Sequence, residues 1–505
     1  MRNAPVRSAY LIALVIVVGI LGSRLGAIPE ASAAVNCCHH AFVLSDIQPH
    51  PGELVVVTGI VTDQYGTGQL GVQVTYSDTT LTSKNATSDS RGVFQIAFTT
   101  PQTPSGSIVS FTLSMHDAMT GWRATATDSY AINQVSGDVP VLYFDQATGG
   151  RGAYVRLESP SLPAVIYIGG GYELDFLHGV NQLDAATTAF LDFLSNSGFN
   201  VLAPVRWFSP DYPSFPLVLG ALLKYGFLIT RVYLLGWSAG GVAAAWALTN
   251  DVNRIFSLAV IMDAELDGPS EANTRTPTSV FTTAQSAGKV TIPHLLIWGE
   301  NDPGNFSVQK AAKWVAHASP GTVRLDALPY SHAWLGTNAE RLVREDIATF
   351  FATGFPGTNM ALDTPLGNYT ERIRIVTNLR LSNITYDPSV KILNVTASAT
   401  SGDFGSINII VPVTLFAGEP IVMLGSNVLR PAVYEDAGNY YVFFTLIGMP
   451  YTQVILVGGE DTIPEVPSAL VLIALTLGVT LCAVRVKRPR AFAFFDAATQ
   501  RPARP

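Results

Sequence analysis

RVYLLGWSAGGVAAAWAL, residues 231–248, predicts the architecture of the central part of this chain. The apolar residues Val232–Leu235 predict a buried strand, and the small residues after Gly240 predict a closely packed helix. Ser238 lies between them in a G-x-S-x-G pattern, flanked by Gly236 and Gly240. Because only small neighbours permit so sharp a turn, the pattern predicts strained backbone geometry at Ser238.

A serine on such a turn is placed for nucleophilic attack. The turn raises the hydroxyl of Ser238 above the sheet and points the backbone N–H of Ala239 toward an oxyanion formed at an attacked carbonyl. The alternative is an ordinary strand, a glycine turn and a packed helix without chemistry. In this nucleophile elbow the chain resembles the α/β-hydrolase family, which implies a mainly parallel sheet and a triad in the chain order Ser, Asp or Glu, His.

Composition and charge narrow the classes of function. The 505 residues suggest two to four domains, and 48% hydrophobic against 13% charged residues is more apolar than a cytosolic enzyme. Outside the two terminal segments lie 21 of the 30 basic and 36 of the 38 acidic residues, a net charge of about −15. This balance argues against a nucleic-acid partner.

Three cysteines provide no disulfide framework, and the Cys37–His40 cluster has no second cluster to close a metal site, so we expect neither metal nor cofactor.

The N-terminal segment has the order of a secretory signal. Arg2 and Arg7 precede an apolar run, and small residues follow at 31–34, which predicts a signal peptide over residues 1–34. An uncleaved N-terminal membrane anchor is the alternative. Either interpretation predicts that the chain is exported.

The C-terminal segment predicts a single membrane span. Residues 467–484 carry no charge and are long enough to cross a bilayer, and the basic tail 485–505 follows at once. The preceding IPEVPS at 463–468, together with this run and the basic cluster, resembles the PEF-type sorting signals of archaeal surface proteins. We expect a single-pass cell-membrane protein whose folded part is extracellular. Five N-glycosylation sequons are usable in that location, at Asn85, Asn305, Asn368, Asn383 and Asn394.

Strand patterns flank the central part on both sides. Short alternating runs broken by turns over 43–135 predict an immunoglobulin-like β-sandwich, which resembles the repeats of microbial surface proteins. Strand patterns return over 360–460, and this segment resembles the small β-domain that often precedes the anchor of archaeal surface proteins. Such domains imply a stalk and contacts with a surface layer or with glycans.

Apolar strands alternating with helical segments over 139–355 predict an α/β-hydrolase domain with a doubly covered, mainly parallel sheet. The expected strands are Val139–Asp145, Ala153–Glu158, Ala164–Ile168, Asn200–Pro204, Val232–Leu235, Ser257–Met262, His294–Trp298 and Thr322–Leu325. The expected helices are Gln182–Ser197, Ala239–Asn250, Ser307–Ala318 and Ala339–Ala352. Eight strands with the elbow after the fifth follow the order of the family.

The acid of the triad is expected at Asp302. It lies in the turn Gly299–Pro303, GENDP, after an apolar strand, and this turn resembles the acid-bearing loop of the family. Glu300 and Asp263 are alternatives, the latter because some lipases place their acid after the sixth strand. A turn aspartate that caps the next helix is the interpretation without catalysis.

His332 is the expected general base. It lies directly after the eighth predicted strand and before the last helix, where the family keeps its histidine. The other seven histidines lie in other parts of the chain, within secondary structure, or before Ser238. An isolated, solvated loop histidine is the alternative.

A glycine run provides the expected oxyanion donors. The strand Ala164–Ile168 ends in Gly169–Gly171, in the position of the HGGG-type loop of the family. The backbone N–H of Gly170 or Gly171 would therefore join that of Ala239.

These features predict a cell-surface serine hydrolase that cleaves an ester through an acyl-enzyme with Ser238, Asp302 and His332. The substrate is a small-molecule or peptide acyl compound, and the membrane is a partner through the C-terminal helix. A peptidase of the prolyl-oligopeptidase type, an acyltransferase and a non-catalytic adhesion or structural protein remain alternatives. The identity of the acyl group does not follow from the residues.

Overall fold

The computed structural model describes residues 38–133, 140–144, 153–170, 183–204, 214–266, 284–302, 307–319, 321–354, 359–366, 369–398, 404–416, 418–425, 427–447 and 452–459. The chain divides into two compact units, Met1–Pro356 and Gly357–Pro505. The predicted signal peptide, membrane span and basic tail lie outside the described residues. Within the described ranges, no helix is long and apolar enough to cross a membrane.

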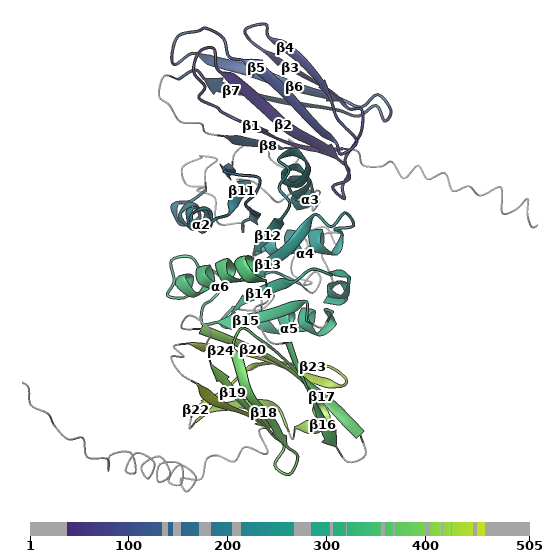
Figure 1. Cartoon of the computed structure of the whole chain (residues 1–505), viewed down its shortest axis with the longest axis vertical. Helices are drawn as coiled ribbons and strands as arrows, with labels where there is room; N and C mark the ends of the chain where they lie inside the picture. The colour runs from purple at the N-terminus through teal and green to yellow at the C-terminus, as the bar shows by residue number, and fades with distance from the viewer. Residues whose placement is uncertain are drawn as a thin grey trace, which may run out of the picture. The chain divides into compact units, whose positions relative to one another are not determined.

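Unit 1 begins with two four-stranded antiparallel sheets that share one hydrophobic core (Figure 1). One sheet has the order β5-β2-β1-β8, and the other has the order β4-β3-β6-β7. The strands are β1 (His39–Leu44), β2 (Leu54–Thr62), β3 (Gln73–Asp78), β4 (Ser83–Thr87), β5 (Val93–Thr99), β6 (Ile108–His116), β7 (Arg123–Ala131) and β8 (Val141–Phe144). Tyr76 and Phe98 stack between the sheets with ring centroids 4.2 Å apart. The predicted β-sandwich is therefore present, and its immunoglobulin-like identity stays a prediction.

One predicted strand belongs to a different sheet from the one expected. The strand Val139–Asp145, expected first in the α/β sheet, is β8, and it pairs antiparallel with β1, with Leu44 opposite Val141. Tyr143 of β8 stacks on Phe42 of β1 at 4.9 Å between ring centroids, which buries both rings. An apolar strand gains the same burial from any sheet edge, so its pattern does not identify its neighbour. Cys38, at the start of this sheet, takes part in a disulfide bond, which the sparse cysteine content did not predict.

A seven-stranded mixed sheet forms the rest of unit 1, with the order β15-β14-β13-β12-β10-β11-β9. Its strands are β9 (Ala153–Arg156), β10 (Ala164–Ile168), β11 (Asn200–Pro204), β12 (Val232–Trp237), β13 (Phe256–Met262), β14 (His294–Gly299) and β15 (Val323–Leu328). Only the pairing of β9 with β11 is antiparallel among these strands, and the other pairs are parallel. The expected eight-stranded sheet is thus seven-stranded, because β8 lies in the sandwich.

Helices cover both faces of this sheet, with α2 and α6 on one side and α3, α4 and α5 on the other (Figure 1). Their bounds are α2 (Ala185–Asn196), α3 (Phe215–Ala221), α4 (Ala239–Thr249), α5 (Val308–His317) and α6 (Glu340–Thr353). A short π-helix, η2 (Leu222–Gly226), continues α3, and a 3₁₀ helix, η4 (Ala284–Lys289), precedes β14. Every residue of β10, β12 and β14 is buried, as expected for strands covered on both faces. Four helices agree with the sequence prediction, whereas α3 was not predicted.

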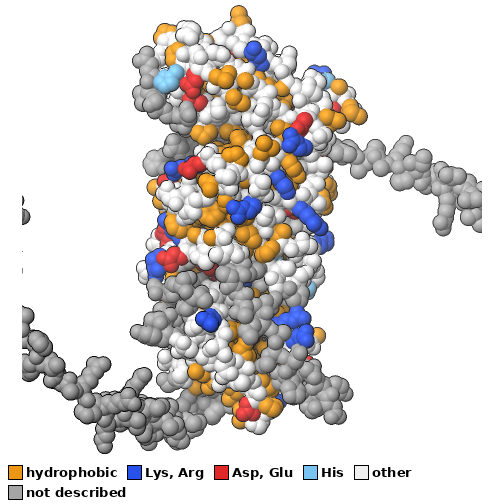
Figure 2. Space-filling view, in the orientation of Figure 1, with side chains coloured by type: hydrophobic (Ala, Val, Ile, Leu, Met, Phe, Trp, Pro, Cys, Tyr) orange, Lys and Arg blue, Asp and Glu red, His pale blue; other side chains and the backbone are white. Residues whose placement is uncertain are grey.

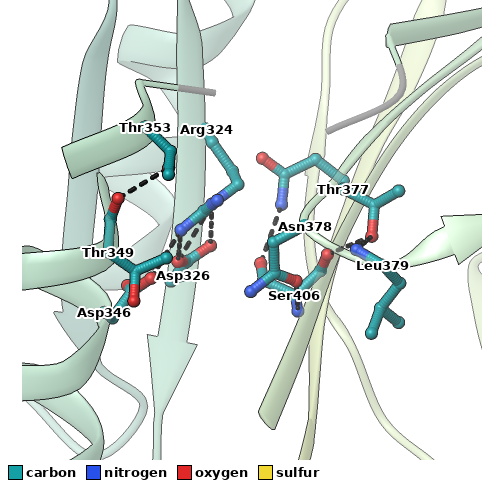
Figure 3. Close-up of polar contacts among 10 residues, drawn as sticks. Arg324, Asp326, Asp346, Thr349, Thr353, Thr377, Asn378, Leu379 and Ser406 are labelled. Carbon is teal, nitrogen blue, oxygen red and sulfur yellow. Dashed lines mark hydrogen bonds and ion pairs between the residues drawn. The ribbon is translucent and has the colours of Figure 1, made fainter. Parts of the chain in front are cut away.

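Charge is distributed differently on the surface and in the interior. On the face drawn in Figure 2, basic and acidic side chains are interspersed with hydrophobic and uncharged ones. Inside the α/β sheet, Arg324 of β15 lies between Asp326 and Asp346 (Figure 3). Its guanidinium donates to both oxygens of Asp326 at 2.7–3.0 Å and to Asp346 Oδ1 at 2.6 Å. The two carboxylates compensate the buried cation and join the edge strand to α6.

Unit 2 contains two five-stranded antiparallel sheets around a second hydrophobic core. The first sheet is β16 (Asn359–Leu366), β17 (Tyr369–Thr377), β20 (Phe404–Pro412), β24 (Asn439–Ile447) and β23 (Ala432–Glu435). The second is β18 (Arg380–Asp387), β19 (Ile392–Ser398), β25 (Gln453–Gly459), β21 (Pro420–Leu424) and β22 (Asn427–Leu429), and a short 3₁₀ turn, η6 (Val413–Leu415), follows β20.

Hydrogen bonds hold the segment of unit 2 in which the chain passes from one sheet to the other. Thr377 Oγ1 donates to the carbonyl oxygen of Ser406 at 2.6 Å, and the N–H of Ser406 donates to Asn378 Oδ1 at 2.8 Å (Figure 3). The N–H of Leu379 in turn donates to Thr377 Oγ1 at 3.0 Å. These bonds satisfy buried backbone groups where the chain passes from β17 to β18.

Candidate active site

Ser238 occupies a strained turn between β12 and α4. Its backbone angles are φ 54° and ψ −122°, a region that residues with a Cβ rarely adopt. Its N–H donates to the carbonyl oxygen of Met262 at the end of β13, at 2.8 Å, which fixes the turn to the neighbouring strand. The predicted strand-to-helix turn is therefore present, and the Ser238 hydroxyl makes no capping hydrogen bond to α4.

The glycines around Ser238 are required by close backbone contacts. A Cβ on Gly240 would lie 2.0 Å from the carbonyl oxygen of Ile168, and one on Gly236 would lie 2.4 Å from the carbonyl oxygen of Gly240. Real Cβ atoms do not approach backbone oxygens so closely, so larger residues would force the helix away from the sheet. The G-x-S-x-G pattern thus reflects the packing of α4 against β10 and β12.

His332 links Ser238 to Asp302 through both of its ring nitrogens. Nε2 lies 2.8 Å from Ser238 Oγ, and Nδ1 lies 2.8 Å from Asp302 Oδ2. Because a carboxylate only accepts hydrogen bonds, the proton of the neutral imidazole belongs on Nδ1, which leaves Nε2 to accept from the serine hydroxyl. The structure therefore brings His332 together with Ser238, 94 positions away in the chain, and with Asp302, 30 positions away.

The elements that carry this chain of hydrogen bonds are the carboxyl ends of parallel strands. Ser238 follows β12, Asp302 follows β14 and His332 follows β15. Asp302 is only 6% exposed, which protects its bond to His332 from competing water, whereas the His332 side chain is 24% exposed to solvent. The geometry suits proton transfer from a nucleophile to a base.

The two alternative acids have other hydrogen-bond partners. The Glu300 side chain is exposed, and its backbone N–H donates to the carbonyl oxygen of Leu328 at 2.8 Å. Asp263 is fully buried. Its Oδ1 accepts from the N–H of Gly299 at 2.9 Å, and its Oδ2 lies 3.0 Å from the hydroxyl of Tyr330. Of the three candidates, Asp302 is the one hydrogen-bonded to His332.

The predicted oxyanion donors are described in part. Ala239 is the first residue of α4, so its N–H has no acceptor within the helix. A Cβ on Gly170 would lie 3.1 Å from Ser238 Cβ, which places the backbone of Gly170 against the serine. Gly171 lies outside the described residues. The positive end of α4 and the glycine segment after β10 therefore meet beside Ser238.

Trp237 is a neighbour of the site that the sequence analysis did not identify. Its indole Nε1 donates to the backbone oxygen of His332 at 3.2 Å, and its ring centroid lies 5.7 Å from that of the imidazole. This contact ties the segment that carries His332 to the elbow. A buried tryptophan directly before Ser238 was the available signal, because an indole N–H in a core needs an acceptor.

Two further segments of the sequence bear on the surroundings of the site. The aromatic segment Arg206–Phe215, expected to wall a pocket, and the polar stretch Glu265–Thr283, expected to form at most a small cap, lie mostly outside the described residues. In the described part of the chain, no three His, Cys, Asp or Glu side chains are grouped so that they could hold a metal ion.

No protein-family model matches the chain, and no curated protein matches it. Solved structures resemble it over part of its length. Est1E from Butyrivibrio proteoclasticus is 15% identical with a TM-score of 0.32, and the match covers 40% of this chain and 92% of that one. The monoacylglycerol lipase of Paleococcus ferrophilus is 12% identical with a TM-score of 0.31, covering 40% and 98%. The esterase domain of a Rhodothermus marinus protein is 12% identical with a TM-score of 0.31, covering 47% and 96%.

Proposed function

We propose that the chain is a serine hydrolase that cleaves carboxylic esters, with Ser238 as nucleophile, His332 as general base and Asp302 as the acid that orients it. The observation that supports this most is the continuous hydrogen-bond chain from Ser238 Oγ through His332 to Asp302, with both contacts at 2.8 Å. A serine hydroxyl is a weak nucleophile unless such a base accepts its proton. The strained turn at Ser238 and the glycines around it support the same role.

The reaction proceeds in two halves. Ser238 Oγ attacks the ester carbonyl carbon while His332 Nε2 takes the hydroxyl proton, and the N–H groups of Ala239 and of Gly170 or Gly171 hold the oxyanion. The tetrahedral intermediate collapses, and the alcohol leaves with the proton from His332. Water then attacks the acyl-enzyme with His332 as base, and the carboxylic acid is released as Ser238 regains its proton.

We also propose that the chain is anchored in the membrane and that its hydrolase part acts outside the cell. Support comes from the signal-like order at residues 1–34 and from the uncharged run 467–484 followed by basic residues. The β-portions on either side would hold the enzyme near glycans or a surface layer. In unit 2, two sequons face each other across β18 and β19, with Asn383 opposite Thr396 and Thr385 opposite Asn394, which would place two glycans together.

Turnover of simple esters tests the proposal. The purified full-length chain should hydrolyse p-nitrophenyl esters of short or medium acyl chains, and Ser238→Ala should lower kcat on the order of 10⁵-fold, because the nucleophile is removed. Ser195→Ala is a matched control, since it removes another buried serine hydroxyl, in α2 and outside the segments that carry Ser238, Asp302 and His332.

The control should turn over esters like the wild type. Release of p-nitroaniline from peptide anilides in place of ester turnover would favour the peptidase alternative. Ester turnover that persists unchanged in Ser238→Ala would contradict the assigned nucleophile.

A further inference from the structure

Asp263 is a second buried acid close to the proposed triad, and the mechanism above does not use it. It follows β13 with φ 43°, a backbone conformation that favours glycine, and its side chain is fully buried. A buried carboxyl group in strained backbone is costly, so it persists only where other contacts hold it. Those contacts lead to the three segments that carry the proposed triad.

The first contact of Asp263 is with the segment that carries Asp302. Asp263 Oδ1 accepts from the N–H of Gly299 at 2.9 Å, and the carbonyl oxygen of Gly299 accepts from the N–H of Asp302 at 3.1 Å. The turn that ends in Asp302 therefore starts on a residue that Asp263 holds.

The second contact is with the segment that carries His332. Asp263 Oδ2 lies 3.0 Å from the hydroxyl of Tyr330, two residues before His332. The carbonyl oxygen of Tyr330 accepts from the N–H of Asn301, next to Asp302, at 3.1 Å. A Cβ on Gly299 would lie 2.7 Å from that carbonyl oxygen, so the two segments are in direct backbone contact.

The elbow is joined to the same point through the backbone. Met262, which directly precedes Asp263, accepts the N–H of Ser238 at 2.8 Å. Asp263 thus lies at the carboxyl end of β13, in contact with the segments that follow β14 and β15 and next to the residue that binds the elbow after β12. A displacement there would change the relative positions of all three proposed catalytic groups.

We infer that Asp263 is a positioning residue: its carboxyl group joins the turn that carries Asp302 to the segment that carries His332, and so sets the distance between their side chains. The inference rests on the proposed function and assigns it a fourth residue. The carboxyl group does not take part in proton transfer, because both its oxygens bond to Gly299 and Tyr330 and not to His332.

Electrostatics are compatible with this role. Burial raises the pKa of Asp263 well above its usual range, the N–H of Gly299 opposes the rise, and the nearby charge of Asp302 adds to it. A raised pKa favours the proton-bound carboxyl group, which keeps a second negative charge away from Asp302. Asparagine is then a close replacement, because its oxygen can accept from Gly299 and its NH₂ can donate to Tyr330.

Four variants of the full-length chain test the inference, with Asp263→Ala and Tyr330→Phe removing the connection and Asp263→Asn keeping it. Asp251→Asn is the matched control, because Asp251 accepts from the N–H groups of Ile255 and Phe256 at the opposite end of β13. The kcat and KM for an ester are measured per active site, counted by stoichiometric fluorophosphonate labelling. The proton bound to His332 Nδ1 is followed by NMR as a strongly deshielded signal, assigned by its loss in His332→Ala.

We expect Asp263→Ala to lower kcat per labelled site about 10²-fold with little change in KM, because misplaced catalytic groups slow the chemistry more than binding. Its His332 signal should shift or broaden. Tyr330→Phe should show a smaller effect in the same direction, and Asp263→Asn and Asp251→Asn should keep both kcat and the signal.

A purely structural role for Asp263 would give a different result. Asp263→Ala would then unfold more easily yet keep kcat per labelled site and an unshifted His332 signal, which would overturn the inference. If the wild type hydrolyses no ester, the proposed function fails separately. In that case the NMR signal alone decides, since a shift in Asp263→Ala supports the positioning role and an unchanged signal overturns it.

Discussion

At the scale of single residues, the proposed chemistry depends on which acid faces His332. Asp302 and Glu300 are two positions apart in one turn, yet Asp302 is buried against the imidazole and Glu300 is exposed. The difference arises from the turn itself. The N–H of Asp302 bonds back to Gly299, which directs its side chain inward, whereas the N–H of Glu300 pairs with the backbone of Leu328.

Substitution of these two acids should separate their roles. Asp302→Asn should lower kcat for an ester on the order of 10⁴-fold, because an amide favours the wrong tautomer of His332. Glu300→Gln should leave kcat near the wild-type value, since its side chain does not contact the imidazole. Steady-state kinetics on both variants would check this, and a large loss in Glu300→Gln with none in Asp302→Asn would reverse the assignment.

At the scale of secondary-structure elements, the turn at Ser238 depends on close packing of α4 against β10. The start of α4 lies so close to β10 that Gly240 has no room for a Cβ. The same approach brings the Gly170 backbone against Ser238. The position of α4, the proposed oxyanion donors and the geometry of Ser238 therefore depend on one close contact between α4 and β10.

Gly240→Ala should destabilise the fold. Its Cβ would meet the backbone oxygens of Ile168 and Gly169 at 2.0 and 2.5 Å, and relief of such overpacking costs about 1–3 kcal/mol or more. Gly288→Ala is the control, because the nearest atom to its Cβ is 3.3 Å away. Urea unfolding of both variants measures the cost, and equal midpoints for the two would refute the close-contact account.

Elements with strong local patterns were predictable, and those defined by partners were not. The elbow, β10, β14 and the helices α2, α4, α5 and α6 have apolar or amphipathic patterns that determine their type. Strand β8 has such a pattern too, but the choice between the sandwich edge and the α/β sheet is made in three dimensions. Polar edge strands such as β18, RLSNITYD, have only half-buried or exposed residues and so give little signal.

The same distinction applies to the site. Ser238, Asp302 and His332 follow apolar strands in a recognisable order, so their positions could be predicted. The roles of Trp237 and Asp263 could not, because each depends on a contact with a segment far away in the chain: Trp237 with His332, and Asp263 with Gly299 and Tyr330.

At the scale of the whole molecule, the chain combines two units with separate hydrophobic cores, each built from its own residues. Within unit 1, β8 joins the sandwich and directly precedes the strands of the α/β sheet. The stability of unit 1 also depends on buried ionisable groups. His294 of β14 is fully buried, where its Nε2 accepts from Trp314 Nε1 at 3.0 Å.

Acid should weaken this part of the molecule. Burial lowers the pKa of His294 from 6.5 to about 4, against a smaller opposing effect of the Ile292 carbonyl. The folded state therefore holds His294 neutral while the unfolded state binds a proton below pH 6.5. Its stabilising contribution is complete above pH 6.5 and is lost progressively as the pH drops from 6.5 to about 4, by roughly 3 kcal/mol in total.

Denaturant unfolding from pH 7 to pH 4 measures this loss by comparison with His294→Gln, which cannot titrate. The wild type should lose more stability than the variant over that range, and His317→Gln, at the end of α5, should follow the wild type. Parallel pH curves for the wild type and His294→Gln would rule out the contribution of His294.

The most direct test of the proposed mechanism is the site of covalent attack by a fluorophosphonate. After reaction of the full-length protein, peptide mass spectrometry should find the phosphonyl adduct on Ser238 alone, and Ser238→Ala and His332→Ala should react at least about 10³-fold more slowly. An adduct on another residue, or no reaction of the folded wild type, would contradict Ser238 as an activated nucleophile.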